Sequence, residues 1–273
     1  MKKAFSIITP VFNRRVEVIQ SIESSLRFIK TVQEDAEIVV IDDGSTDNTY
    51  EHIISNFSKE ISQKKIRVFK LSSNVGPTGA KQYGVTQSLG EWLIFMDSDD
   101  LFSEFGIVDS YKKLSSTSKD FPIVFFRCIG SKDSKLLGNP QRDTTYLNLK
   151  SFIHYGTPGE CLPVVRKECL MENPFNEELK GFESLTYAKI IKDYGSCVVY
   201  PNILRIYRND ENFNRLSHKI NHIARGCVMA RGHFHYIVNF CSILQLRVIL
   251  ILIKILYHMI NCLVFNLKNI LNK

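Results

Sequence analysis

The sequence lacks any C-x-x-C pair, although it contains seven cysteines. Structural zinc sites and dithiol redox motifs commonly begin with two cysteines at that spacing, so the sequence indicates neither. We expect the cysteines to be reduced packing residues of a cytosolic protein. The amino terminus also lacks a signal-peptide core, because only a short apolar stretch precedes Pro10 and Asn13. Export is therefore not expected.

Acidic residues are scarce towards the carboxyl terminus, where Asp210 and Glu211 are the only acids after Pro201. Basic residues are numerous in the same part, and the whole chain has a net charge of +7. A basic surface favours an anionic partner, which could be a membrane surface, phosphate groups or nucleic acid.

The first part of the chain contains an alternation of short β-branched runs and amphipathic stretches. This pattern is typical of an α/β fold in which helices cover a mostly parallel sheet. We predict strands over 4–9, 37–41, 66–71 and 92–96, and helices over 18–29, from a cap at Ser45 or Thr46, and over 78–88. After Asp100 the pattern weakens to a helix over 104–114, a strand over 123–128 and a polar, turn-rich stretch over 131–145.

Polar residues follow each of the four predicted strands. The segments are Thr9-Pro10-Val11-Phe12-Asn13, Asp42-Asp43-Gly44-Ser45, Gly76-Pro77-Thr78-Gly79 and Asp97-Ser98-Asp99-Asp100. Ligands of open α/β sheets bind beyond the carboxyl ends of the strands, so these segments would line one site. The second and third segments can also be read as plain turns or helix caps. The fourth is harder to read that way, because crowded carboxylates repel one another unless a cation such as Mg²⁺ intervenes.

The segments IITPVFN, VVIDDGSTDNT, NVGPTGAKQYG and GEWLIFMDSDD stand in this order in the chain. As a set they resemble the inverting glycosyltransferases of family 2, which have the GT-A fold. The resemblance implies that Thr9, Pro10 and Phe12 lie against the nucleotide base, that Asp42 or Asp43 binds the base or ribose, and that Gly76, Ala80 and Lys81 pass near the ribose and diphosphate. It also implies that Asp97, Ser98 and Asp99 form the D-x-D motif that holds the ribose and a Mn²⁺ or Mg²⁺ ion.

The resemblance further implies a general base at the start of a helix, and Gly181-Phe182-Glu183-Ser184-Leu185 fits that position. Many family members have Glu-Asp here, whereas this chain has Ser184 in place of the second acid. A carboxylate in the first helical turn is stabilised as the anion, so Glu183 could accept a proton from a sugar hydroxyl. An ordinary first-turn acid is the alternative, with Glu177 and Glu178 as substitute bases.

Arg208 and the segment Arg215-Leu216-Ser217-His218 resemble the region that closes over the diphosphate in related enzymes. Arg208 or Arg215 could pair with phosphate oxygens, and His218 could be a late metal ligand. A surface arginine and a hydrogen-bonded histidine are the plainer interpretations.

The segment 245–273 is very apolar, but its polar residues fall in one narrow sector of a helical wheel. These residues are Arg247, Lys254, His258, Asn261, Lys268 and Asn272. Because the segment lacks an uninterrupted apolar run of spanning length, we favour a helix in the plane of the membrane. A helix packed on the catalytic domain and a membrane hairpin are the alternatives.

Three regions follow: a nucleotide-sugar-binding α/β domain over 1–130, an acceptor-binding and catalytic-base region over 131–235, and a membrane-associating helix over 236–273. We hypothesise a metal-dependent inverting glycosyltransferase of surface polysaccharide biosynthesis, such as O-antigen assembly, on the inner face of the plasma membrane. By the resemblance its donor would be a UDP-sugar and its acceptor a glycan or a polyprenyl-diphosphate-linked sugar. No nucleic acid is expected to take part.

Two rival functions stay open. A nucleotidyltransferase would also hold a nucleotide and a metal ion, but its glycine-rich phosphate loop is missing, because residues 10–15 contain no glycine. A non-catalytic, membrane-associated binding subunit with the same fold is the second rival.

Overall fold

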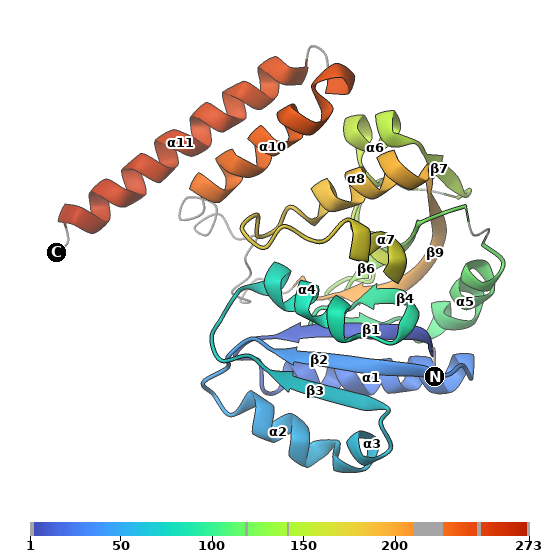
Figure 1. Cartoon of the computed structure of the whole chain (residues 1–273). Coiled ribbons are helices and arrows are strands. Elements are labelled where there is room, and N and C mark those ends of the chain that lie inside the picture. Colours follow the sequence, from blue (N-terminus) through green and yellow to red (C-terminus); the bar gives the residue numbers. More distant parts are fainter. Residues whose placement is uncertain (1–2, 118–119, 141, 210–225, 245–246, 272–273) are drawn as a thin grey trace.

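The computed structural model describes residues 3–117, 120–140, 142–209, 226–244 and 247–271. A nine-stranded sheet runs through it in the order β3-β2-β1-β4-β8-β6-β9-β5, with β7 paired to β9 (Figure 1). The strands are β1 (Lys3–Val11), β2 (Ala36–Asp42), β3 (Ile66–Lys70), β4 (Gly90–Phe95), β5 (Leu101–Phe102), β6 (Ile123–Gly130), β7 (Thr145–Leu147), β8 (Cys161–Arg166) and β9 (Cys197–Tyr207). The helices are α1 (Glu17–Val32), α2 (Thr49–Asn56), α3 (Ser58–Ser62), α4 (Pro77–Gln87), α5 (Ile107–Ser115) after a 3₁₀ turn (Glu104–Gly106), α6 (Leu149–Tyr155), α7 (Lys167–Glu172), α8 (Glu183–Tyr194), α10 (Gly226–Leu244) and α11 (Arg247–Leu271).

The four strands predicted in the first part of the chain form the parallel half of the sheet. β1 pairs in parallel with β2 on one side and with β4 on the other, and β2 pairs in parallel with β3. Every residue of β2 is buried, as expected for a strand with helices on both of its faces. The α/β prediction is therefore confirmed, and the carboxyl ends of these strands lie along one edge.

The second half of the sheet was predicted only at β6. β8 lies antiparallel to both β4 and β6, and β9 runs parallel to β6. Pro163 interrupts β8, and Pro201 with Asn202 interrupts β9, so neither strand has a clean β-branched run. Because a single sheet continues through β9, the boundary proposed at residue 130 stays a functional prediction and is not a break in the core.

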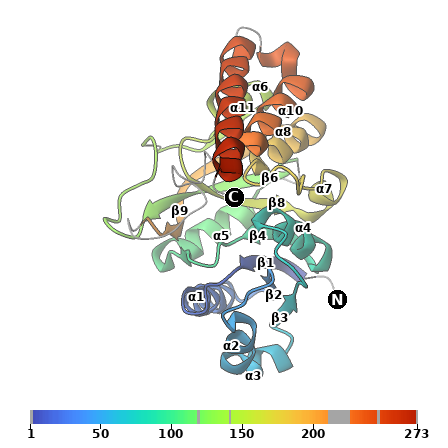
Figure 2. The same ribbon diagram turned by 90° about the vertical axis from the view of Figure 1, so that its left-hand side faces the viewer.

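Helices cover the sheet in two layers, with α1 and α5 on one face and α4, α7 and α8 on the other (Figure 2). Alternate residues of each strand point to opposite layers. In β1, Ile7 packs in the layer of α1, and its neighbour Ile8 packs in the layer of α4. In the first layer, the Phe28 ring stacks on Phe102 with the centroids 4.4 Å apart.

The helix after β2 starts later than predicted. Its cap is Asn48, which has a left-handed backbone conformation with φ 63°, and not Ser45 or Thr46. The Asp47 carboxylate accepts a hydrogen bond from the Thr49 N–H at 3.1 Å at the start of the helix. The extra residues extend the loop that follows β2 at the carboxyl edge.

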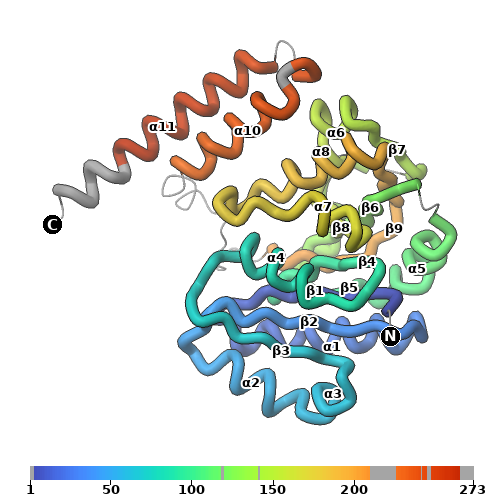
Figure 3. The backbone as a smooth tube through the Cα atoms, viewed as in Figure 1, coloured from blue at the N-terminus to red at the C-terminus, as the bar shows by residue number. Residues whose placement is uncertain are grey.

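The carboxyl-terminal part forms a hairpin of two helices, of which only α11 was predicted. α10 lies between α11 and α8 (Figure 1), and α11 lies on the outer side of α10, farther from the sheet (Figure 3). Among the described helices, α11 alone is long and apolar enough to cross a membrane, with a mean hydropathy of 1.9 over Arg247–Val264. Whether α11 lies in the plane of a membrane, as predicted, stays a prediction.

The expectation that all cysteines are reduced is wrong at one pair. Cys227 of α10 and Cys262 of α11 form a disulfide, although they are 35 residues apart in the sequence. The contact between the two helices brings them together, which the spacing of the cysteines did not indicate. Cys128, Cys161, Cys169 and Cys197 are free and buried, as expected for packing residues.

Candidate functional site

The loops that follow β1 and β2 meet at the carboxyl edge of the sheet. The Asn13 N–H donates a hydrogen bond to Ser45 Oγ at 2.9 Å, and the Thr46 N–H donates to Asn13 Oδ1 at 2.9 Å. Asn13 has a positive φ of 50°, a conformation that asparagine tolerates better than most residues. The two loops therefore form one connected surface.

Asp43 joins the loop after β2 to the turn before α4. Its carboxylate oxygens accept hydrogen bonds from the N–H groups of Val75 at 2.7 Å and Gly76 at 2.8 Å. Burial raises the pKa of Asp43 above its usual value, although these two hydrogen bonds act to lower it. Because both oxygens bind backbone groups, Asp43 closes a loop, and Asp42 is the better candidate for a contact with the base or ribose.

Asp42 and Thr9 lie on neighbouring strands, Asp42 opposite Val11 and Thr9 opposite Val40, and each has a side-chain oxygen without a partner in the described part of the chain. Asp42 Oδ1 accepts a hydrogen bond from the Ser45 N–H at 2.8 Å. Asp42 Oδ2 and Thr9 Oγ1 are buried and have no hydrogen-bond partner among the described residues. Since buried polar atoms nearly always find partners, these atoms mark a place where a ligand or water would complete the site.

The other residues predicted near the nucleotide differ in their exposure. Phe12 is 43% exposed and offers an aromatic ring at the edge of the site. Gly76 has a positive φ of 86°, and a Cβ there would also meet the Lys180 side chain. Pro10 and Ala80 are buried, and Ala80 packs in the core beneath α4. The Ala80 side chain therefore packs in the core, and the passage of its backbone near the ribose and diphosphate stays a prediction.

Lys81 lies between the acidic turn after β4 and the first residue of α8. Its Nζ is 3.5 Å from Asp97 Oδ1 and 3.6 Å from Glu183 Oε1, and its side chain is only 15% exposed. Burial acts to lower the pKa of Lys81, but the carboxylates of Asp97 and Glu183 outweigh it and raise the pKa above its usual value. One ammonium group thus links the expected donor acid to the expected base.

Glu183 is held by α4 from a second direction. Thr78 Oγ1 donates a hydrogen bond to Glu183 Oε1 at 3.3 Å, and it accepts one from the Gly181 N–H at 3.3 Å. The substitute bases Glu177 and Glu178 are exposed. Of the three glutamates, Glu183 is the one that contacts the lysine of the site.

The acidic residues of the D-x-D turn differ in their exposure and in their partners. Asp97 is 40% exposed, whereas Asp99 is 11% exposed and lies 3.6 Å from Arg14 Nη1. Ser98, between them, is buried. Asp100 accepts a hydrogen bond from the Arg208 N–H at 2.9 Å, which ties the end of β9 to the turn.

Arg205 anchors the turn from inside the sheet. It is 4% exposed, and its guanidinium lies 3.5 Å from Asp100 Oδ2 and 2.5 Å from Glu160 Oε1. Asp100, which is 1% exposed, is therefore a structural acid, and Asp97 and Asp99 are the candidates for ligand contacts.

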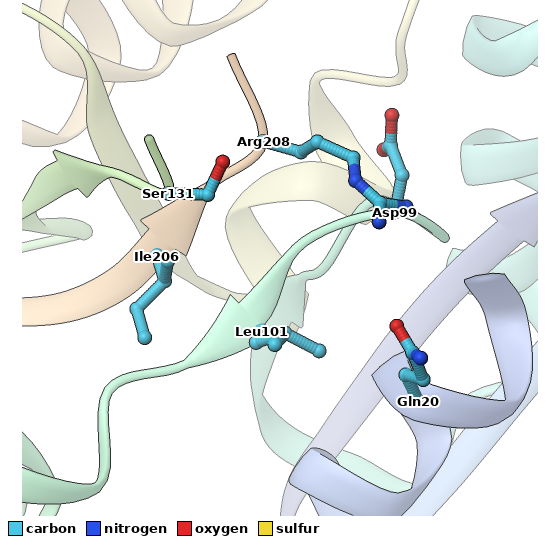
Figure 4. Close-up of a pocket in the computed structure, with 6 residues that line it drawn as sticks. All are labelled: Gln20, Asp99, Leu101, Ser131, Ile206 and Arg208. Atoms are coloured by element: carbon cyan, nitrogen blue, oxygen red, sulfur yellow. The ribbon is translucent and has the colours of Figure 1, made fainter. Parts of the chain in front are cut away.

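A cavity of about 180 Å³ lies beside Asp99 (Figure 4). Its lining residues are Gln20, Asp99, Leu101, Ser131, Ile206 and Arg208. Figure 4 shows the Arg208 side chain extending towards Asp99 on one side of the cavity. Arg208, predicted to pair with phosphate oxygens, and Asp99, the second acid of the D-x-D motif, therefore lie beside the same cavity. A site for a charged group requires charged side chains placed in this way.

Asp97 and Asp99 suit a divalent ion only together with a substrate. The described residues contain no group of three or more histidine, cysteine, aspartate or glutamate side chains that could hold a metal by themselves. Mg²⁺ and similar ions, however, are usually bound by one or two carboxylates plus substrate phosphates and water. The two acids fit that pattern, so a diphosphate would have to supply the remaining ligands.

Some predicted residues were not located, and some residues of the site were not predicted. Arg215 and His218 lie outside the described residues. Arg14 and Arg205 contact the acidic turn but were not singled out, because isolated arginines carry no local signal. Thr78 belongs to a segment that was noted, and its contact with Glu183 could not be read from the sequence.

A protein-family model described as Glycosyl transferase family 2 matches residues 6–162. The GalNAc(5)-diNAcBac-PP-undecaprenol beta-1,3-glucosyltransferase of Campylobacter jejuni is 29% identical over 213 residues, which cover 75% of this chain and 65% of that protein. An uncharacterized glycosyltransferase of Rickettsia bellii is 43% identical over 97 residues, which cover 36% of this chain and 13% of that protein. The chain spans less than two thirds of the length of these curated relatives.

Solved structures share the fold. Staphylococcus aureus TarS 1–349 in complex with UDP-GlcNAc has a TM-score of 0.65 and 21% identity, with 87% of this chain and 67% of that chain covered. The mannosyltransferase PcManGT from Pyrobaculum calidifontis, in complex with GDP-Man and Mn²⁺, has a TM-score of 0.63 and 14% identity, with 99% and 81% covered. These similarities confirm the predicted GT-A fold.

Proposed function

The chain belongs to glycosyl transferase family 2, and from that premise we propose that it transfers a sugar from a nucleotide-diphosphate sugar to a hydroxyl group, with inversion at the anomeric carbon. The observation that carries the proposal is the position of Lys81, whose Nζ lies within 3.6 Å of carboxylate oxygens of both Asp97 and Glu183. Lys81 thus brings a donor-side acid and a base candidate into one site, and a single displacement requires the base and the donor to be close together.

The donor binds along the carboxyl edge of the sheet. Asp42 and Thr9 offer the unused buried oxygens to the base or ribose, and Phe12 offers its ring. Asp97 and Asp99 face the diphosphate and would hold Mn²⁺ or Mg²⁺ together with it. When bound, that ion stabilises the negative charge of the departing diphosphate. Arg208 lies beside Asp99 and is suited to a phosphate oxygen.

Glu183 acts on the acceptor side. Its carboxylate takes the proton of the acceptor hydroxyl while the hydroxyl oxygen attacks the anomeric carbon and the nucleoside diphosphate leaves. Lys81 and Thr78 hold the carboxylate in place. A single displacement needs no covalent sugar intermediate.

We propose that the acceptor is a lipid-linked sugar at the inner face of the plasma membrane. Two features support this proposal: the apolar helix α11 and the basic character of the chain beyond Pro201. The name of the C. jejuni relative states a polyprenyl-diphosphate-linked acceptor. The TarS complex contains UDP-GlcNAc, which favours a UDP-sugar as donor. We accordingly propose a role in surface polysaccharide biosynthesis.

A screen of nucleotide sugars by thermal shift, with and without Mn²⁺, tests the donor half of the proposal. A ligand that binds only the folded state raises the melting temperature according to its concentration and affinity. We expect a UDP-sugar to stabilise the protein more in the presence of Mn²⁺, and Asp97→Asn to remove the effect of the metal. The best donor is then assayed for release of UDP.

The outcomes separate the candidate functions. Stabilisation by a UDP-sugar without any hydrolysis or transfer would favour the non-catalytic binding subunit. Stabilisation by a nucleoside triphosphate in preference to any nucleotide sugar would favour the nucleotidyltransferase.

A further inference from the structure

The helical turn that carries Glu183 has no cap of its own. Phe182 occupies the N-cap position of α8 with φ −113°, and its side chain makes no capping hydrogen bond. Uncapped helix starts leave backbone N–H groups unsatisfied and tend to fray. A base on such a turn has to be fixed by contacts from neighbouring elements.

One set of contacts comes from α4. Thr78 bonds to the Gly181 N–H and to the Glu183 carboxylate, both at 3.3 Å, and Lys81 pairs with the same carboxylate. These contacts restrain the turn from the donor side of the site only.

A second set comes from α10, on the opposite side. Tyr236 Oη donates a hydrogen bond to Ser184 Oγ at 2.7 Å. The His233 ring meets the Phe182 ring edge-on, with the centroids 5.5 Å apart and the planes at 89°. A Cβ at Gly232 would lie 2.4 Å from the Phe182 ring, so the helix can approach this closely only with glycine there. The residues just before and just after the base are thus both contacted by α10.

α10 is itself fixed between the protein body and α11. Phe240 and Leu244 of α10 are buried in the core layer that contains α8. On its outer side, His233 stacks on His258 of α11, with the centroids 5.5 Å apart. A displacement of α11 is therefore passed to the same helical turn, around His233, that touches Phe182.

The outer face of α11 is apolar and has no cover among the described residues. Ten of its side chains are between 41% and 61% exposed: Ile249, Leu250, Leu252, Ile253, Leu256, Tyr257, Met259, Ile260, Leu263 and Val264. Arg231, Arg247 and Lys254 are exposed on the same hairpin, and neither of its helices contains an acidic residue. An apolar face with cations and no acids is complementary to an anionic lipid surface.

We propose that the hairpin of α10 and α11 is part of the acceptor side of the active site. Gly232 and Tyr236 are positioning residues that fix the Glu183 turn, and seating α11 on an anionic lipid surface holds this turn in its productive position. The proposal rests on the proposed role of Glu183 as the base. It also gives a function to Ser184, where the family resemblance implies a second acid: its hydroxyl oxygen accepts the hydrogen bond from the Tyr236 hydroxyl.

Tyr236→Phe and Ser184→Ala in the full chain remove the hydrogen bond and little else. The probe is the nucleotide sugar that the wild type hydrolyses fastest with Mn²⁺. We expect each variant to lower kcat roughly three- to tenfold with an unchanged KM for the donor, and the double variant to be no worse than either single one. Tyr146→Phe removes a tyrosine hydroxyl from β7, remote from the hairpin and 61% exposed, and should match the wild type.

Amide hydrogen exchange and the effect of lipid vesicles on kcat distinguish a positioning role of Tyr236 from a merely structural one. Amides of residues 183–186 should exchange faster in Tyr236→Phe, while those of β1 stay protected. Vesicles containing phosphatidylglycerol should raise kcat of the wild type several-fold and have less effect on Tyr236→Phe, and pure phosphatidylcholine vesicles should have little effect on either.

The results distinguish two failures. If the wild type hydrolyses a nucleotide sugar but the variants have the same kcat and exchange rates, the positioning proposal is wrong and the proposed function stands. If the wild type turns over no nucleotide sugar, the proposed function fails, and the role of the hairpin fails with it. A wild type whose kcat is indifferent to anionic vesicles would overturn the coupling to the lipid surface.

Discussion

Replacing Lys81 by methionine should disturb both halves of the site at once. The side chain keeps its length but loses the ammonium that lies 3.5 Å from Asp97 Oδ1 and 3.6 Å from Glu183 Oε1. With an effective dielectric constant of about 20, each attraction is worth about 5 kcal/mol before desolvation is counted. Asp97 is 40% exposed, so solvent screens its pair strongly, whereas Glu183 is 20% exposed.

After screening and the cost of burying the ammonium, we expect Lys81→Met to lower the free energy of unfolding by about 2–3 kcal/mol. The melting temperature should fall by roughly 4–12 °C. Turnover of the best nucleotide sugar should fall at least about tenfold, because the Glu183 carboxylate loses the partner that orients it. Differential scanning calorimetry and an assay of UDP release measure the two effects.

Lys81→Arg is the matched control, since it keeps the charge near both carboxylates. It should retain more of the stability and more of the turnover than Lys81→Met. A methionine variant with the melting temperature and turnover of the wild type would refute the reasoning. Equal losses in the two variants would show that the shape of the lysine matters and its charge does not.

Three further predictions concern the loop, the tail and pH. Asp43→Asn should lower the free energy of unfolding by about 1.5–3 kcal/mol, because the N–H groups of Val75 and Gly76 lose a charged hydrogen-bond acceptor. An unchanged midpoint of urea unfolding would contradict this. Ile260→Asp on α11, 52% exposed, should weaken binding to phosphatidylglycerol vesicles at least about tenfold, whereas Val108→Asp on α5, 47% exposed, should not. Equal binding of the two variants in a vesicle sedimentation assay would count against the membrane surface. Burial, aided by the nearby His258 and Lys254, lowers the pKa of His233 from 6.5 to about 4. Between about pH 6.5 and 4, His233 therefore binds a proton in the unfolded chain but not in the folded chain. The part of the free energy of unfolding that depends on neutral His233 is fully present above about pH 6.5 and is lost as the pH falls towards 4. Melting curves of the wild type and His233→Leu across this range test the prediction, and identical pH dependence would contradict it.

The parallel half of the fold was predictable because its signals are local. β2, for example, contains the uninterrupted β-branched run 38–41, and chemically distinct residues mark the strand ends. That the loops after these strands lie close together follows from the parallel arrangement, in which the carboxyl ends of the strands meet at one edge of the sheet. The start of α2 was misplaced because Ser45 uses its hydroxyl to accept a hydrogen bond from Asn13 in the adjoining loop and does not cap the helix.

The rest depends on contacts between distant parts of the chain. Asp100 and Arg208 are hydrogen-bonded across 108 residues, and Arg205 beside them shows no pattern in the sequence that indicates a buried arginine. Asp42 and Asp43 are adjacent and chemically identical, so only their partners in the structure separate a loop-closing acid from a ligand candidate. The bond between Tyr236 and Ser184 spans 52 residues, and it explains a departure from the family pattern that the sequence could only record.

The central claim is that Glu183 removes the acceptor proton while the donor is held elsewhere in the site. Glu183→Gln keeps the shape of the side chain and removes its capacity to accept a proton. The decisive measurement is the turnover of the best donor by this variant, with its donor affinity measured by calorimetry on the same sample. The account predicts that kcat falls by about two to four orders of magnitude while the donor Kd stays within a few-fold of the wild type. A variant that keeps wild-type turnover would contradict it.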